Sequence, residues 1–252
     1  MNCLINKYFL FFLLIVFSHP LRAWDKLALF EFQTFSVEGA NEGNEQRIQY
    51  QKKLDYSGSF FRRDRFDKTE YLLNGEKSFE PIKKLFLHPG ATVGINSETF
   101  EKYSLSLNAD YYGIIPFNFS GFISFKKYDL ADVILFSPSV HWETKIGLLL
   151  MGQVFYGNLI ADRGSKATMA YSLKAVYLNS VFRPYAFYSI GEEAAVLLEN
   201  LKLTDYEVRS FGIGGKFPLG KEFALEGDYQ NLDLKDFDRT LEYFTIRVVR
   251  KW

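Results

Sequence analysis

Apolar and polar residues alternate along this chain in repeated runs, and the last run is the clearest of them. Because successive side chains of a strand point to opposite faces, the segment 239–252 predicts a strand with one apolar face and one mixed polar face. The run ends on an aromatic residue. The apolar face carries Phe244, Ile246, Val248 and Trp252, and the other face carries Tyr243, Thr245 and Arg247.

The same alternation recurs at 103–111, 117–123, 169–177 and 223–229. Each run has about ten residues, the length that a tilted strand needs to cross the hydrocarbon core of a membrane. Aromatic residues such as Tyr103 stand at the ends of runs, where the girdle of a membrane barrel would place them. The pattern predicts an all-β fold, a single antiparallel up-and-down transmembrane β-barrel.

The number of strands follows from counting back from residue 252, with both chain ends on the side of the short turns. This gives fourteen strands, with twelve as the alternative, since 45–63 can also be one long strand. Longer polar connections are expected at 38–45, 157–165, 191–203 and 233–238, and the helix-favouring residues 192–200 are expected in a partly ordered outer loop. The predicted strands are 27–37, 45–53, 55–63, 67–79, 84–96, 102–112, 117–127, 131–142, 145–156, 165–178, 182–190, 204–217, 221–232 and 239–252.

Residues 1–23 have the pattern of an export signal. Lys7 supplies a positive charge, 8–17 form an apolar core, and cleavage is expected after Ala23. A retained membrane anchor is the alternative, but the core is about half the ~20 residues that a spanning helix needs. Cys3 would leave with the signal, so disulfides and cysteine metal sites are excluded from the remainder. We expect 24–252 to form one domain in the cell outer membrane.

Composition narrows the function classes. The formal net charge is zero, which argues against nucleic acid as a partner. Aromatic residues make up 18% of the chain, an excess that suits a surface in contact with lipid. The competing fold is a soluble periplasmic β-sandwich or lipocalin-like barrel, whose strands also alternate but whose apolar face packs on a core.

With the strands laid out, the chain resembles the YaiO family of outer-membrane β-barrels, over most of the residues after the signal. One departure is the end in Trp252, where such barrels more often end in phenylalanine. The resemblance implies an outer-membrane location and a barrel fold, sometimes joined to repeat-containing segments, and no settled activity. The similar stretches are Phe60–Phe66 (FFRRDRF), Tyr103–Phe125, Tyr185–Gly191 (YAFYSIG) and Phe211–Gly215 (FGIGG).

Candidate chemistry is sparse, and we expect no catalytic, cofactor-binding or metal-binding residues. A barrel enzyme acting on lipid would need a nucleophile, a base and an orienting group within reach. His88 is expected at a break within a strand and His141 at a short turn, where neither meets such a group. The aspartates at 233, 236 and 238 do not match a calcium loop.

Charged residues on the predicted inner face are the stronger candidates. Pairing the last hairpin about residues 235–236 places Glu226 opposite Thr245, with Arg247 diagonal to it. Two interpretations stay open: the charges line a water-filled passage, or they pair across a narrow lumen and hold it shut. The predicted network is Glu222, Glu226, Asp228, Arg247 and Lys174, with Lys145 and Asp110 added from other strands.

A basic cluster and the last strand predict partners. Arg62, Arg63 and Arg65 are expected on an outer loop, where they could bind lipopolysaccharide phosphates. Pairing with Asp64 is the competing explanation. The final strand, with Phe244, Ile246, Val248 and Trp252, is the expected assembly signal for the barrel-assembly machinery. The sequence thus predicts a non-enzymatic envelope protein that passes a solute or polymer, or docks partners through its outer loops.

Overall fold

The computed structural model describes residues 26–37, 43–52, 55–65, 68–97, 101–114, 116–161, 164–178, 181–197, 202–220, 222–235 and 239–251. The expected signal at 1–23 and its cleavage point, the aspartates at 236 and 238, and Trp252 lie outside these residues. Among those described, no helix is long and apolar enough to cross a membrane.

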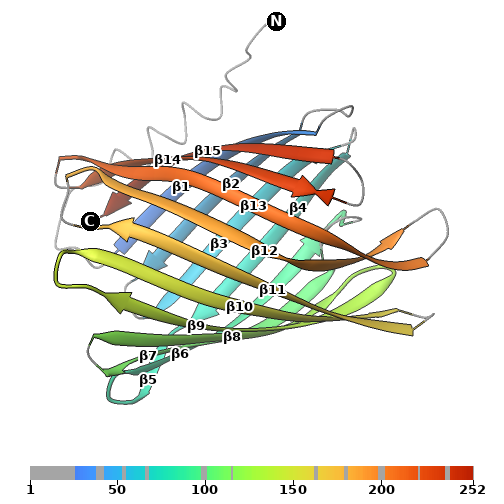
Figure 1. Cartoon of the computed structure of the whole chain (residues 1–252), viewed down its shortest axis with the longest axis horizontal. Coiled ribbons are helices and arrows are strands. Elements are labelled where there is room, and N and C mark those ends of the chain that lie inside the picture. The colour runs from blue at the N-terminus through green and yellow to red at the C-terminus, as the bar shows by residue number, and fades with distance from the viewer. Residues whose placement is uncertain are drawn as a thin grey trace, which may run out of the picture.

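Antiparallel strands form one closed barrel (Figure 1). Strands that follow each other in the chain pair with each other, except that β4 pairs with β6 and not with β5. The ring is closed by the pairing of β1 with β15. The strands are β1 (Lys26–Val37), β2 (Gly43–Lys52), β3 (Tyr56–Arg65), β4 (Lys68–Lys77), β5 (Phe79–Ile82), β6 (Leu85–Ile95), β7 (Tyr103–Ile114), β8 (Phe117–Lys127), β9 (Ala131–Glu143), β10 (Leu148–Ala161), β11 (Gly164–Tyr177), β12 (Arg183–Leu197), β13 (Lys202–Leu219), β14 (Phe223–Leu234) and β15 (Arg239–Lys251).

Fourteen of these strands make the ring, because β5 pairs only with β6. The predicted fourteen-strand barrel is therefore confirmed. The twelve-strand alternative is wrong, since 45–63 contains two strands, β2 and β3, that pair antiparallel across a turn at Asp55. The ring of fourteen strands is closed, and closure is the condition for crossing a hydrocarbon layer with strands.

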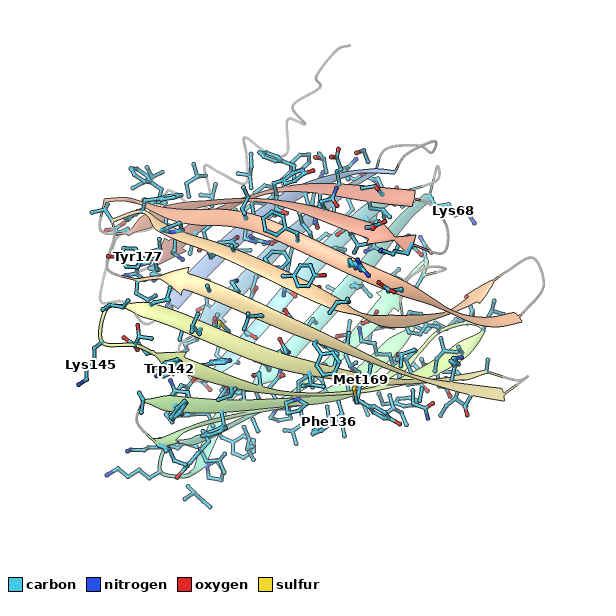
Figure 2. All side chains as sticks on the ribbon, viewed as in Figure 1. Lys68, Phe136, Trp142, Lys145, Met169 and Tyr177 are labelled. Carbon is cyan, nitrogen blue, oxygen red and sulfur yellow. The ribbon has the colours of Figure 1, made fainter. Side chains whose placement is uncertain are left out.

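Side chains separate by face as the alternation predicts. On β7, Leu105 and Leu107 are 59% and 39% exposed on the outer surface, while Ser104 is buried. Figure 2 shows Phe136, Trp142 and Met169 projecting from the outside of the barrel. Large exposed apolar side chains on every part of the outer wall would be costly in water. The outer surface thus has the character of a lipid-facing wall.

The structure corrects the prediction of long outer loops. Residues 157–161 continue β10, and Ala161 pairs directly with Gly164 at the start of β11. Residues 192–197 are strand, not a helix-like loop, and pair with β13 as far as Leu197 opposite Lys202. Pairing with a neighbouring strand overrides the local helix preference of this segment. The predicted strand at 145–156 begins only at Leu148, because Lys145 lies in the preceding turn.

A second correction concerns His88. The strand β6 runs without a break through His88, Pro89 and Gly90, and all three pair with β7. The interruption lies in its other neighbour, where β4 ends at Lys77 and β5 begins at Phe79. Pro89, which has no N–H to donate, sits where β6 changes partner from β5 to β4.

Candidate functional site: the inner wall of the barrel

The strand register places a row of charged side chains across the inner wall. Residues paired directly across antiparallel strands share a face, with Cβ atoms about 5 Å apart. We call this set the charge row. It crosses six neighbouring strands, β12, β13, β14, β15, β1 and β2, and consists of Arg183, Lys216, Glu226, Arg247, Glu31 and Arg47.

Ion pairs link most of the row. Arg247 donates to Glu31 and also to Asp228, which lies one step along β14 on the same face. Lys216 pairs with Glu226. The side chain of Asp228 is only 10% exposed and that of Arg247 25% exposed. At this depth each charge needs its partner, because an unpaired charge away from water is expensive.

The predicted network is brought together in part. Glu226, Asp228 and Arg247 do share the inner wall, but Glu226 lies opposite Arg247 and not opposite Thr245. The turn is centred one residue later than predicted, which shifts the pairing by two residues and leaves the faces unchanged. Lys174 lies one strand beyond the row, with its Nζ 4.3 Å from the centre of the Tyr185 ring, a cation–π contact.

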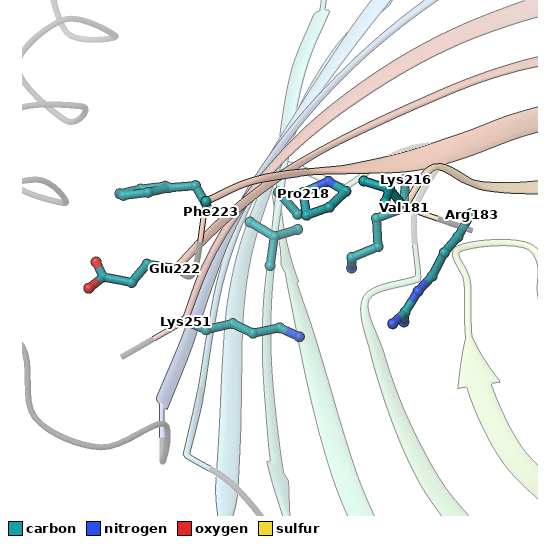
Figure 3. Close-up of a pocket in the computed structure, with 10 residues that line it drawn as sticks. Val181, Arg183, Lys216, Pro218, Glu222, Phe223 and Lys251 are labelled. Atoms are coloured by element: carbon teal, nitrogen blue, oxygen red, sulfur yellow. The ribbon is translucent and has the colours of Figure 1, made fainter. Parts of the chain in front are cut away.

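Two predicted members are not in the network. Glu222 lies in the turn before β14, and its carboxylate points away from Lys216 (Figure 3). Lys145 lies in the turn before β10 and projects away from the barrel (Figure 2). Sequence reasoning missed Glu31, Lys216, Arg183 and Arg47, because only the β1–β15 closure and the strand register align them with Arg247. Their inward parity within each strand was the available signal.

A second polar cluster lies on β6, β7, β8 and β9. The His88 Nε2 atom is 3.2 Å from Asp110 Oδ2, and Ser120 donates to Asp110 at 2.5 Å. His141 follows on β9, 3.3 Å from the Ser139 hydroxyl. These groups line a cavity of about 370 Å³ with amide, hydroxyl and carboxylate side chains. The predicted position of His141 at a turn is wrong, since β9 continues to Glu143.

A chain of Ser78, His88 and Asp110 has the composition of a hydrolytic triad. Ser78 Oγ lies 2.8 Å from His88 Nδ1. Ser78 is only 8% exposed and does not line the cavity beside His88. A nucleophile needs room for a carbonyl carbon at about 3 Å. We interpret the contacts among Ser78, His88 and Asp110 as structural: they stabilise the region where β4 ends and β5 begins. Among the described residues, no group of three or more metal-ligating side chains is assembled.

The arginine cluster is placed differently from the expectation. Arg62 and Arg63 lie within β3 and not on a loop, so they point to opposite faces. Arg63 turns inward and bonds Glu45 at 2.5 Å, whereas Arg62 turns outward and bonds Asp64 at 2.9 Å. The side chain of Arg65 lies outside the described residues. The alternative explanation of the cluster, pairing with Asp64, is therefore observed for Arg62.

The last strand has the two faces that the sequence predicts. Phe244 and Ile246 are exposed on the outer wall, and Val248 has the same parity. Arg250 shares this outward parity near the end of β15, and its guanidinium carbon lies 5.4 Å from the Phe223 ring centre. A cation at the end of a spanning strand is tolerated where its long side chain reaches the interface.

Comparison with known proteins places the fold in a class. No protein-family model and no curated protein matches the chain. Among solved structures, the barrel is similar to the OmpT loop L8 deletion mutant, an outer membrane protein of Vibrio cholerae, with 9% identity and a TM-score of 0.56 over 91% of this chain and 99% of that one. The fold is that of outer-membrane β-barrel proteins.

Two further structures agree with this class. The anion-selective porin from Comamonas acidovorans has 9% identity and a TM-score of 0.54, covering 91% of this chain and 99% of its own. The COG4313 outer membrane channel from Pseudomonas putida F1 has 6% identity and a TM-score of 0.57, covering 94% and 98%. At such identities the likeness concerns the fold alone, and the resemblance to the YaiO family stays a prediction.

Proposed function

We propose that the chain is an outer-membrane β-barrel protein of the YaiO type whose polar lumen passes small solutes and which catalyses no reaction. The observation that carries the proposal is the charge row, which faces the lumen while the opposite face of the same strands is apolar. A barrel with a purely structural role would not need charges on six adjacent strands, because buried ion pairs add little net stability. Charges that line a lumen tune which solutes enter it.

Passage is better supported than docking through outer loops. The widest gap between consecutive strands at the end of the barrel away from the chain termini runs from Ile95 to Tyr103. The other connections at that end are shorter, so they offer little surface to a partner. The paired charges narrow the lumen without removing its polar lining, so we expect small solutes to pass and polymers to be excluded.

Recording currents across a planar bilayer tests the proposal. Purified protein that inserts should give stable steps of small conductance, because the lumen is polar but narrowed by Arg247 and its partners. A barrel that inserts, shown by protection from protease, and yet stays silent at all voltages would overturn passage. It would favour the closed network that the sequence also allowed.

The location can be tested separately. We infer that the protein resides in the outer membrane, because its outer wall is apolar and its neighbours in fold are outer-membrane proteins. Separated membranes should contain it in the outer-membrane fraction, and unheated samples should migrate differently from boiled ones on a gel. Recovery as a water-soluble monomer would contradict this.

Two partner predictions belong to the same proposal. Assembly is expected to depend on Phe244, Ile246 and Val248, and their replacement by serine should reduce insertion by the barrel-assembly machinery. Of the two arginines of the cluster whose side chains the structure describes, Arg62 lies on the outer wall and Arg63 points inward, so we expect Arg62 to contact lipopolysaccharide. Arg62→Gln should therefore weaken retention of lipopolysaccharide during purification, whereas Arg63→Gln should not.

A further inference from the structure

One end of the lumen carries a cavity lined by more cations than carboxylates. We call this end the terminal rim: it is the end at which β1 begins and β15 ends. Arg183 begins β12, Lys216 lies near the end of β13, and Lys251 ends β15. All three line a cavity of about 390 Å³, and Figure 3 shows their nitrogen ends turned toward that cavity.

The charge balance of this cavity is positive. Lys216 is paired with Glu226, whereas Arg183 and Lys251 form no ion pair among the residues that the structure describes. Among the residues that line the cavity, Glu222 carries the one carboxylate, and it points away from the three cations (Figure 3). Arg183 and Lys216 are also paired directly across β12 and β13. Like charges placed opposite each other destabilise a sheet, and an anion bound beside Arg183 and Lys216 would offset this cost.

The charges in the rest of the lumen are also distributed unequally between its two sides. Deeper on the same side lies Lys174, whose ammonium group is placed over the Tyr185 ring. In the order of strands around the ring, β4, β6 and β7 lie across from β14. These strands carry Glu76 and Asp110 on the inner wall. One side of the lumen is thus basic and the facing side acidic, and an anion is drawn to the basic side.

We propose that the cavity between Arg183, Lys216 and Lys251 is a binding site for small anions that carry phosphate or carboxylate groups, and that it selects such solutes for passage. This inference rests on the proposed passage and names its substrate class. Arg183 offers two parallel N–H donors to a pair of anionic oxygens, and Lys251 adds a point charge. The volume admits a solute of the size of pyrophosphate or a small dicarboxylate.

The test compares the natural protein with two double variants. Arg183→Gln with Lys251→Gln removes the two cations that have no ion pair. Lys83→Gln with Lys145→Gln is the matched control, since both lysines are exposed in turns at the same rim and lie outside the cavity. All three proteins are first checked for the heat-dependent gel shift, so that a failure to fold is recognised.

Bilayer currents in a potassium chloride gradient give the first result. We expect the natural protein and the control to prefer chloride, and the preference to fall by about two- to fivefold in the Arg183 and Lys251 variant. Pyrophosphate should block the current of the natural protein, and the blocking concentration should rise about tenfold in that variant. Equal preference and equal block in all three proteins would overturn the inference while leaving passage in place.

A binding measurement separates the two proposals. Phosphorus NMR of pyrophosphate mixed with detergent-solubilised barrel reports binding without any current. If no protein conducts but pyrophosphate signals broaden with the natural protein and the control, and not with the variant, then the site stands and passage fails. Absence of broadening with the natural protein overturns the site.

Discussion

Single residues show how the inner wall differs from the outer one. Arg247 holds two carboxylates from neighbouring strands, Glu31 of β1 and Asp228 of β14. It therefore ties the first strand of the chain to the last two. On the outer wall large apolar side chains predominate, as expected for contact with lipid.

Removing the shared cation should destabilise the barrel. Arg247→Gln leaves two partly buried carboxylates facing each other, and we expect a loss of about 1 to 3 kcal/mol in the free energy of unfolding, since the site keeps some contact with water. Urea unfolding from lipid vesicles, followed by tryptophan fluorescence, measures it. Adding Glu31→Gln and Asp228→Asn to this variant should recover most of the lost free energy of unfolding. If no stability is recovered, the pairing is contradicted.

The lipid face can be tested with a pair of adjacent residues. Leu107 lies near the middle of β7 on the outer wall, and Asn108 is next to it on the inner wall, where it donates to Glu76. Leu107→Lys should cost about 2 to 4 kcal/mol in the same unfolding measurement, because it places a charge in hydrocarbon. Asn108→Lys should cost less, since Glu76 and Asp110 are near. Similar costs would argue against a lipid-facing wall.

Asp55 is an ionisable residue in the turn between β2 and β3, outside the membrane-spanning segments. A hydrogen bond from Lys77, and a second from Lys52 at 2.9 Å, lower the pKa of its carboxyl. A lowered pKa means that these contacts are complete at neutral pH and are lost as the pH falls through it. In an NMR titration, Asp55 should protonate below a peptide aspartate, and Lys77→Gln should move its pKa back upward.

At the scale of elements, hairpin register matters more than local preference. The segment 192–197 has the residues of a helix, yet its backbone pairs with β13 along its whole length. The turn from β13 to β14 shows the opposite case, in which the local backbone conformation favours one residue type. Gly220 has a φ of 81° there, a conformation that glycine adopts without steric cost.

A glycine pair tests this turn. Gly220→Ala should lower the free energy of unfolding by about 1 kcal/mol, because alanine is strained at positive φ. Gly121→Ala on β8 is the control, since an added methyl group there meets no atom within 4 Å and the backbone is extended. Unfolding curves of both variants in vesicles provide the comparison. Equal stability of the two would contradict a strained turn.

At the scale of the molecule, the ring is not uniformly strong. The seam between β1 and β15 has eleven registered residue pairs, whereas that between β4 and β6 has six. The reason is the break at Ser78, after which β5 replaces β4 as the partner of β6. The short seam is the expected place for the barrel to open.

Hydrogen exchange should reveal the weaker seam. Amides that pair β4 with β6 should exchange about tenfold faster than those that pair β1 with β15, since local opening there breaks fewer contacts. Mass spectrometry of the detergent-solubilised protein measures the rates. Cysteines in place of Asn74 and Thr92, whose side chains are 3.0 Å apart, should form a disulfide that removes the difference. Uniform exchange without the disulfide would contradict a weak seam.

The sequence by itself predicted the strands and their faces, and it left fourteen or twelve as their number. Alternation with a period of two is a local property, so Phe244 and Arg247 could be assigned to opposite walls without knowledge of any neighbour. Loop lengths were overestimated, because polar residues such as Asn158 and Lys166 continue a strand as readily as they form a loop.

Only the tertiary structure decided which charges meet. Glu31 and Arg247 are separated by 216 positions and become partners because the ring closes between the first and last strands. The direct pairing of Arg183 with Lys216 depends on a register that a shift of two residues would move without changing any face. Register is a property of pairs of strands, and the pattern within one strand does not contain it.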